Sequence, residues 1–183
     1  FLNEECKFGY RDSIFKNELK GKYIITSVIL KLNKKPIFNT SYGAIQDTIK
    51  ELNLPELSIE NISKAVCHIR STKLPDPEKI GNAGSFFKNP EIFEEHFFEL
   101  KEQFPDIVSF KTSTNKIKIP AGWLIEKCGW KGKTFDSYGV HKNQALVLVN
   151  YGGADGKKIK KLSEKIKKSV LEFFEIELET EVN

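Results

Sequence analysis

Three short stretches combine residue types that could bind an anion or move a proton. The first, Gly9-Tyr10-Arg11-Asp12-Ser13, places an arginine between a tyrosine and an aspartate. A guanidinium can hold a planar carboxylate or phosphate through two parallel N–H donors. The alternative is an ordinary surface ion pair between Arg11 and Asp12 or another acid, and the spacing alone does not separate the two.

The second stretch, residues 81–90, reads Gly-Asn-Ala-Gly-Ser-Phe-Phe-Lys-Asn-Pro. Glycines let the backbone approach a ligand closely, and the N-terminus of a following helix favours negative charge. Ser85 would then stand at the mouth of a pocket as a hydroxyl donor, with Asn89 as a further polar contact. The same residues also fit a plain turn into a capped helix, with Phe86 and Phe87 anchored in the core.

The third stretch pairs Arg70 with Lys73, two cations three positions apart. They could meet phosphates, or they could complement the C-terminal dipole of a helix. No Ser-His-Asp order, Walker loop or metal-ligand spacing accompanies these stretches. The residue pattern alone therefore predicts a domain that binds an anionic ligand and goes no further.

The composition supports a packed, non-membrane domain in a reducing compartment. Of the 183 residues, 39% are hydrophobic and 30% are charged, which suits a folded core. No apolar run reaches the ~18 residues that a membrane span requires. The three cysteines form no C-x-x-C pair, which argues against a disulfide scaffold or a zinc site and favours the cytoplasm.

A net charge of +4 arises largely from lysines between residues 157 and 168. A nucleic-acid surface is one interpretation. However, Ile159, Leu162, Ile166 and Val170 keep helical spacing among the lysines, which indicates the solvated face of an amphipathic helix. Since no aromatic or arginine residues are interleaved there, we favour the solvated face and expect no nucleic-acid partner.

The elements that must position these residues alternate irregularly between strands and helices. Apolar and β-branched runs predict strands at 22–32, 107–111, 116–119, 145–149 and 176–183. Helical spacing and capping residues predict helices after Ser58, from Asn89 to about Pro105, from Pro120 to Gly129, and after Gly152-Gly153, with a short helix at 45–52. Residues 81–85 are expected to form a loop. Because no strand leads into a G-x-G-x-x-G turn, an antiparallel α+β fold is favoured.

At these same segments the sequence resembles the MurB family, the UDP-N-acetylenolpyruvoylglucosamine reductases. The resemblance spans essentially the whole chain in family order, and the stretch at 81–90 is its most specific motif. The other motifs are Gly9-Tyr10-Arg11-Asp12-Ser13, Ala65-Val66-Cys67-His68-Ile69-Arg70, Thr72-Lys73-Leu74-Pro75-Asp76-Pro77, Pro120-Ala121-Gly122-Trp123-Leu124-Ile125-Glu126, Val140-His141-Lys142-Asn143-Gln144-Ala145-Leu146-Val147 and Glu179-Thr180-Glu181-Val182.

The resemblance implies a flavoprotein oxidoreductase of peptidoglycan biosynthesis in the cytoplasm. In that family a hydride passes from NADPH to FAD and then to C3 of UDP-N-acetylglucosamine enolpyruvate, which yields UDP-N-acetylmuramate. By resemblance, Ser85 donates the proton to C2, Arg11 stabilises the enolate carboxylate, and Glu181 orients the proton or helps to deliver it. Tyr42 matches a tyrosine on a loop that closes over the diphosphate. Lys73 and Asn89 match further diphosphate contacts, and Arg70 and Gln144 match contacts to the nucleotide half.

The resemblance also implies a division of the chain. Residues 1–56 would be the tail of the FAD-binding domain, 57–78 a connecting helix and Pro-rich linker, 79–175 the substrate-binding domain, and 176–183 a strand that returns to the flavin site. The chain contains no methionine and its ends read as interrupted elements, so we expect it to be a fragment. We expect such a fragment to be monomeric, to hold FAD weakly at most, and to be inactive by itself. A stand-alone nucleotide-sugar binding module without catalysis is the alternative.

Overall fold

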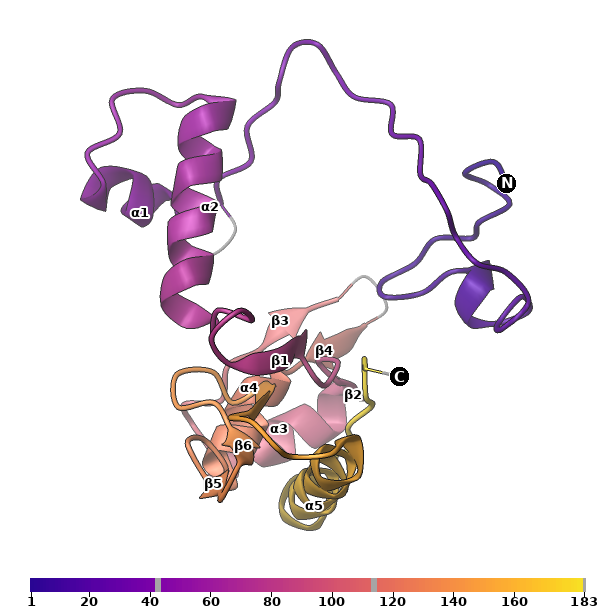
Figure 1. Cartoon of the computed structure of the whole chain (residues 1–183), viewed down its shortest axis with the longest axis vertical. Coiled ribbons are helices and arrows are strands. Elements are labelled where there is room, and N and C mark those ends of the chain that lie inside the picture. The colour runs from indigo at the N-terminus through magenta and orange to yellow at the C-terminus, as the bar shows by residue number, and fades with distance from the viewer. Residues whose placement is uncertain (42–43, 113–114, 183) are drawn as a thin grey trace. The chain divides into compact units, whose positions relative to one another are not determined.

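The computed structural model describes residues 1–41, 44–112 and 115–182 (Figure 1). It divides into two compact units, Phe1–Ile37 and Phe38–Asn183.

The first unit contains a single turn of 3-10 helix, η1, at Ile14–Lys16. The rings of Phe1, Phe15 and Tyr23 meet edge to face, with centroids 5.2 to 6.4 Å apart. The strand predicted at 22–32 is wrong for this chain: the segment pairs with no other strand among the described residues. Ile24 and Ile29 are 91% and 97% exposed, because the segment has the β propensity of a strand but no sheet beside it.

Helices α1 (Ile45–Glu51) and α2 (Ile59–Lys73) open the second unit and pack against each other. Both were predicted. The hydroxyl of Ser58 accepts a hydrogen bond from the Asn61 N–H at 3.2 Å, so α2 begins at the cap that the sequence indicated.

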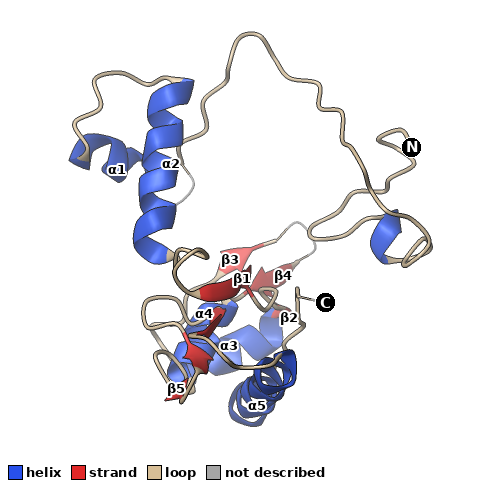
Figure 2. Ribbon diagram, viewed as in Figure 1, coloured by secondary structure: helices blue, strands red, loops and turns tan. Residues whose placement is uncertain are grey.

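Two antiparallel sheets follow, and they confirm the predicted α+β class (Figure 2). The first has the strand order β1-β7-β6-β5, and the second has the order β2-β4-β3. In the first sheet the strands are β1 (Gly81–Ser85), β5 (Thr134–Phe135), β6 (Tyr138–Val140) and β7 (Val147–Asn150). In the second they are β2 (Glu91–Phe93), β3 (Phe110–Lys111) and β4 (Lys116–Lys118).

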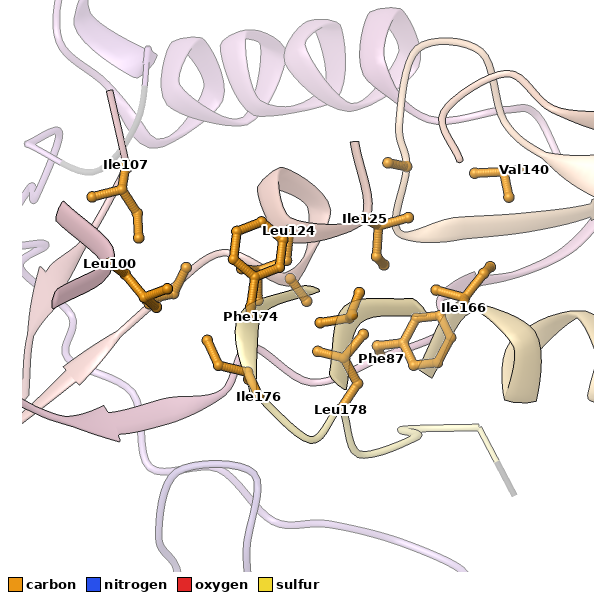
Figure 3. Packing of buried hydrophobic residues seen from close by; sticks show 14 of the residues in the cluster. Phe87, Leu100, Ile107, Leu124, Ile125, Val140, Ile166, Phe174, Ile176 and Leu178 are labelled. Atoms are coloured by element: carbon orange, nitrogen blue, oxygen red, sulfur yellow. The ribbon is translucent and has the colours of Figure 1, made fainter. Parts of the chain in front are cut away.

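Three further helices, α3 (Glu94–Gln103), α4 (Ala121–Lys127) and α5 (Gly156–Phe174), enclose one hydrophobic core with these sheets. Asp155 caps α5 by accepting from the Lys158 N–H at 2.8 Å, and α5 packs against α4, β6 and β7. The core draws side chains from distant parts of the chain, among them Phe87, Leu124, Ile166, Phe174 and Leu178 (Figure 3). Within the described residues, no helix is both long and apolar enough to cross a bilayer.

Three predicted elements need correction. The expected loop at 81–85 is strand β1, because β7 supplies the backbone partners that a glycine-rich segment needs to stay extended. The helix expected from Asn89 begins instead at Glu94, since residues 91–93 pair with β4. The final strand joins neither sheet among the described residues. It is held beside residues 86–88 by the isolated bridge Phe87↔Thr180 and its flanking backbone hydrogen bonds.

Candidate active site

Ser85 is the last residue of β1 and is exposed. The pairing of β1 with β7 shifts register between Asn82 and Ser85, and Gly84 within this bulge has φ +72°, a conformation that favours glycine. Asn82 braces the bulge: its Oδ1 accepts from the Gly84 N–H at 3.0 Å and its Nδ2 donates to the Ile80 carbonyl at 2.8 Å. The glycine-rich stretch is therefore a braced bulge that holds a serine hydroxyl at a strand end.

The C-terminal segment runs antiparallel beside the residues that follow Ser85. The Glu181 N–H donates to the Phe86 carbonyl and the Lys88 N–H donates to the Glu179 carbonyl, each at 2.9 Å. These bonds flank the Phe87↔Thr180 bridge and set Glu181 opposite Phe86. The structure thus brings Glu181 to the neighbour of Ser85 across a sequence separation of almost one hundred residues.

Asn89 and Gln144 meet at the first turn of α4. Asn89 Oδ1 accepts from the Ala121 N–H at 2.9 Å, so it caps α4, where the N-cap residue Pro120 makes no side-chain hydrogen bond. Gln144 Oε1 accepts from the Leu146 N–H at 3.3 Å, and a Cβ placed on Gly122 would lie 3.2 Å from that oxygen. Both amide oxygens are engaged by the protein.

Within residues 1–41, 44–112 and 115–182, neither amide NH2 group has a hydrogen-bond partner, so both can donate to a ligand at this turn. A partner for them must be a hydrogen-bond acceptor, such as a phosphate or carbonyl oxygen. Asn89 therefore caps α4, whose Ala121 is 32 residues further along the chain, and not the helix that was expected to begin at Asn89.

Arg70 and Lys73 lie on the last turn of α2 with exposed side chains. In the described part of the chain neither side chain forms a hydrogen bond or an ion pair. The loop that leads from α2 to β1 is tied back by Asn82, whose Nδ2 also lies 3.4 Å from the Pro75 carbonyl. The two cations therefore precede the short connection into β1, the strand that ends at Ser85.

Arg11 belongs to the first unit, and Tyr42 lies outside the described residues. Arg11 has φ +55° in a tight turn that the Gly9↔Asp12 bridge closes. Its carbonyl accepts from Lys16 Nζ at 2.9 Å. The Asp12 carboxylate accepts from the Ser13 N–H and from Asn17 Nδ2, both at 2.9 Å.

A cavity of about 700 Å³ lies near the site but does not contain it. Strand β1, strand β7, helix α5 and the C-terminal segment line it, and it includes Ala83, Phe86, Thr180 and Val182 but neither Ser85 nor Glu181. Most of its lining is apolar. Ser85 is therefore exposed beside this cavity, and Glu181, which is partly buried, does not line it either.

The titratable groups of the core offer no competing reactive centre. Burial raises the pKa of the Cys128 thiol, which keeps it protonated and unreactive. Burial, with a smaller contribution from the charge of Lys142, lowers the pKa of His141, whose Nδ1 is buried without a hydrogen-bond partner. Among the described residues, no three His, Cys, Asp or Glu side chains come together as a metal site would require.

Comparison with known proteins identifies the family of this chain. The family model "UDP-N-acetylenolpyruvoylglucosamine reductase, C-terminal domain" matches residues 76–183, more than half of the chain. The chain belongs to this family. The MurB resemblance inferred from the motifs is thereby confirmed.

Relatives named UDP-N-acetylenolpyruvoylglucosamine reductase match the whole chain. Those of Flavobacterium johnsoniae and Amoebophilus asiaticus are each 52% identical to it, over 55% and 54% of their own lengths. That of Pseudomonas fluorescens is 44% identical, over 54% of its length. The chain thus spans about half the length of the curated relatives it matches.

Four of the predicted site residues, Ser85, Asn89, Gln144 and Glu181, lie inside the matched C-terminal domain of the reductase family. The other four, Arg11, Tyr42, Arg70 and Lys73, precede it. The structure sets Glu181 opposite Phe86, the residue after Ser85, and brings Asn89 and Gln144 to the first turn of α4. Sequence reasoning missed Lys88, which forms a 2.6 Å ion pair with Glu179 beside the catalytic candidates, because the two are 91 residues apart and give no local signal.

Proposed function

We propose that the chain is the substrate-binding and proton-donating part of a flavoprotein reductase of peptidoglycan biosynthesis. The complete protein would use NADPH and FAD to reduce UDP-N-acetylglucosamine enolpyruvate to UDP-N-acetylmuramate in the cytoplasm. The observation that carries the proposal is the antiparallel contact that places Glu181 opposite Phe86, next to Ser85.

We infer that this chain by itself does not hold the flavin firmly. Ser85 is exposed, and the nearby cavity does not reach it. We therefore assign the binding of FAD mainly to the part of the relatives' length that this chain does not span, and we derive no step at the flavin. What this chain contributes is a proton for the substrate and charges that hold the substrate.

The reduction adds a hydride to C3 and a proton to C2 of the enolpyruvyl group. After the hydride arrives, the electron pair of the former double bond is shared between C2 and the carboxylate. The Ser85 O–H bond breaks as the proton moves to C2, which leaves an alkoxide. A serine hydroxyl is a very weak acid, so it can protonate only a strongly basic carbanion and only when held in place. The braced bulge at Gly84 supplies that fixed position.

Arg11 and Glu181 would manage the charge that develops on the substrate. Arg11 would face the enolate carboxylate, and the loss of one such donor typically costs about 2–4 kcal/mol of transition-state stabilisation. Glu181 would orient the Ser85 hydroxyl or return a proton to its alkoxide. This assignment rests on the family resemblance for Arg11 and on the strand pairing for Glu181.

The diphosphate and nucleotide would be held by hydrogen-bond donors and positively charged side chains. The NH2 groups of Asn89 and Gln144 at the start of α4 suit phosphate or uracil oxygens. Arg70 and Lys73 would supply positive charge from the end of α2, and Tyr42 a phenol donor. The donors at α4 and the cations of α2 together fit a polyanionic ligand.

The test is Ser85→Ala in the complete protein. Reduction of the flavin by NADPH should persist, because that step does not need the C2 proton. Reoxidation of the flavin by UDP-N-acetylglucosamine enolpyruvate should slow by roughly 10²- to 10⁴-fold, the usual contribution of a proton donor. Ser71→Ala removes an exposed serine of α2 whose hydroxyl donates to the His68 carbonyl at 3.0 Å, and it should leave both steps unchanged.

Unchanged turnover in Ser85→Ala would refute the assignment of the proton donor. A complete protein that binds UDP-sugars but holds no flavin would instead favour the nucleotide-sugar binding module.

A further inference from the structure

The two segments that carry Ser85 and Glu181 are joined by an ion pair that the proposed chemistry does not use. Lys88 Nζ lies 2.6 Å from Glu179 Oε2, and the Lys88 N–H donates to the Glu179 carbonyl at 2.9 Å. Lys88 is thus bound to one residue through both its side chain and its backbone. The Lys88 side chain is only 30% exposed, whereas that of Glu179 is 71% exposed.

The glutamates of the C-terminal segment show how this ion pair could set the register of the segment. Glu177, Glu179 and Glu181 alternate along it, so a slip by two residues would present a different acid to Lys88. The buried side chains of Ile176 and Leu178 oppose such a slip from the core side. On the outer side, the position of the Lys88 ammonium selects Glu179 and leaves Glu181 opposite Phe86.

We propose that Lys88 is a positioning residue for the reaction, acting through Glu179 to fix the register in which Glu181 lies beside Ser85. The inference rests on the proposed function of that pair. Lys88 touches neither the substrate nor the proton in this assignment. Its role is to keep the C-terminal segment, which joins neither sheet among the described residues, in the productive alignment.

The expected effect on catalysis exceeds the expected effect on stability. A partly exposed ion pair changes a local equilibrium by only about two- to fivefold. A misplacement of about 1 Å at a reacting group can lower a rate by as much as about 10²-fold. Loss of the pair should therefore affect the substrate half-reaction before it affects folding.

The experiment uses the complete protein with Lys88→Met, which keeps length and removes charge, and with Glu179→Gln. Each should slow the reoxidation of reduced flavin by substrate roughly tenfold, with KM and flavin reduction by NADPH nearly unchanged. The double variant should be no slower than either single variant, because both remove one interaction. Lys88→Glu combined with Glu179→Lys should recover part of the rate. Lys64→Met, which breaks a 2.7 Å pair with Glu60 on α2, is the matched control and should have no effect.

Two results would overturn the inference. If the wild-type protein is active and both Lys88→Met and Glu179→Gln keep its full rate of flavin reoxidation by substrate, the ion pair does not set the alignment of Glu181. A raised KM in Lys88→Met with no effect of Glu179→Gln would show that Lys88 contacts the substrate directly.

A second measurement does not depend on activity and separates this inference from the proposed function. Amide hydrogen exchange at Glu181, whose N–H donates to Phe86, should quicken about two- to fivefold in Lys88→Met. Unchanged exchange would overturn the positioning role. If Lys88→Met quickened this exchange but the wild-type protein showed no reoxidation of flavin by the substrate, the proposed function would be refuted and the role of Lys88 in setting the register would stand.

Discussion

Asn89 is predicted to serve two purposes that separate variants can distinguish. Its Oδ1 accepts from the Ala121 N–H at 2.9 Å, which stabilises the first turn of α4, and its Nδ2 is the proposed donor to the diphosphate. Asn89→Ala removes both groups. Asn89→Asp keeps an oxygen acceptor for Ala121 but replaces the donor with a negative charge.

The magnitudes follow from these contacts. Loss of a helix cap costs about 1 kcal/mol, so Asn89→Ala should lower the Tm of this chain by roughly 2–4 °C. Asn89→Asp should keep its stability near that of the wild type or raise it, since a carboxylate at a helix N-terminus contributes about 0.3–1 kcal/mol. For binding, loss of a hydrogen bond to a charged phosphate costs about 1.5–3 kcal/mol, or roughly 10- to 150-fold in Kd. Asn89→Asp should bind more weakly still, because it adds repulsion.

Thermal unfolding followed by circular dichroism measures the first effect, and calorimetric titration of the complete protein with UDP-N-acetylglucosamine measures the second. We expect the two variants to rank in opposite order: Asn89→Asp should be the more stable of the two, and Asn89→Ala should bind the ligand more tightly. If Asn89→Asp unfolded at the temperature of Asn89→Ala, the cap would not be the stabilising contact. If Asn89→Asp bound the ligand as tightly as the wild type, the amide donor would have no role in binding.

Three further predictions concern the backbone, the pH dependence and the cofactor. Gly139→Ala should destabilise the β5–β6 hairpin by about 3 kcal/mol, the upper end of the usual cost of overpacking, because a Cβ at this position would clash with the Lys133 carbonyl. A Cβ at Gly156 meets nothing within 4 Å, so Gly156→Ala should be neutral in the same denaturant titration. Because the pKa of His141 is lowered in the folded protein, the unfolded chain binds more protons below the ordinary value of 6.5, so stability should fall as pH drops through that value and His141→Gln should flatten this slope. The chain of residues 1–183 should be colourless when purified, and a stoichiometric flavin absorbance would contradict the assignment of FAD to the remaining part of the protein.

Local signals predicted the helices well. Ser58 marked the start of α2, and the apolar stripe among the lysines marked α5, because caps and helical periodicity are written in adjacent residues. The strands were harder to predict. Residues 81–85 resemble a loop by composition, yet β7 and the amide of Asn82 hold them extended. Residues 22–32 have strand propensity but no partner among the described residues. Strand formation depends on distant partners that a local pattern does not contain.

The site shows the same division. The motifs indicated Ser85 and Glu181 by resemblance, and the antiparallel contact with Phe86 brings Glu181 to the segment that follows Ser85. The capping chemistry of Asn89 was predicted correctly, although it was assigned to the wrong helix. Lys88 lacked any signal, because its partner Glu179 is 91 residues away. Glu181, Asn89 and Lys88 each contact a residue far away in the sequence, and local sequence patterns do not predict such contacts.

Core packing and site geometry depend on the same two segments. Phe87 and Leu178 are buried in the core (Figure 3), while the side chains of their sequence neighbours Lys88 and Glu179 are 30% and 71% exposed. Since side chains alternate along an extended segment, burial of one set fixes the direction of the other. A core substitution such as Leu178→Ala therefore perturbs the alignment of Glu181 as well as the stability of the domain. Dense packing beneath an exposed site is the means by which this fold can hold a weakly acidic serine in a defined position without enclosing it.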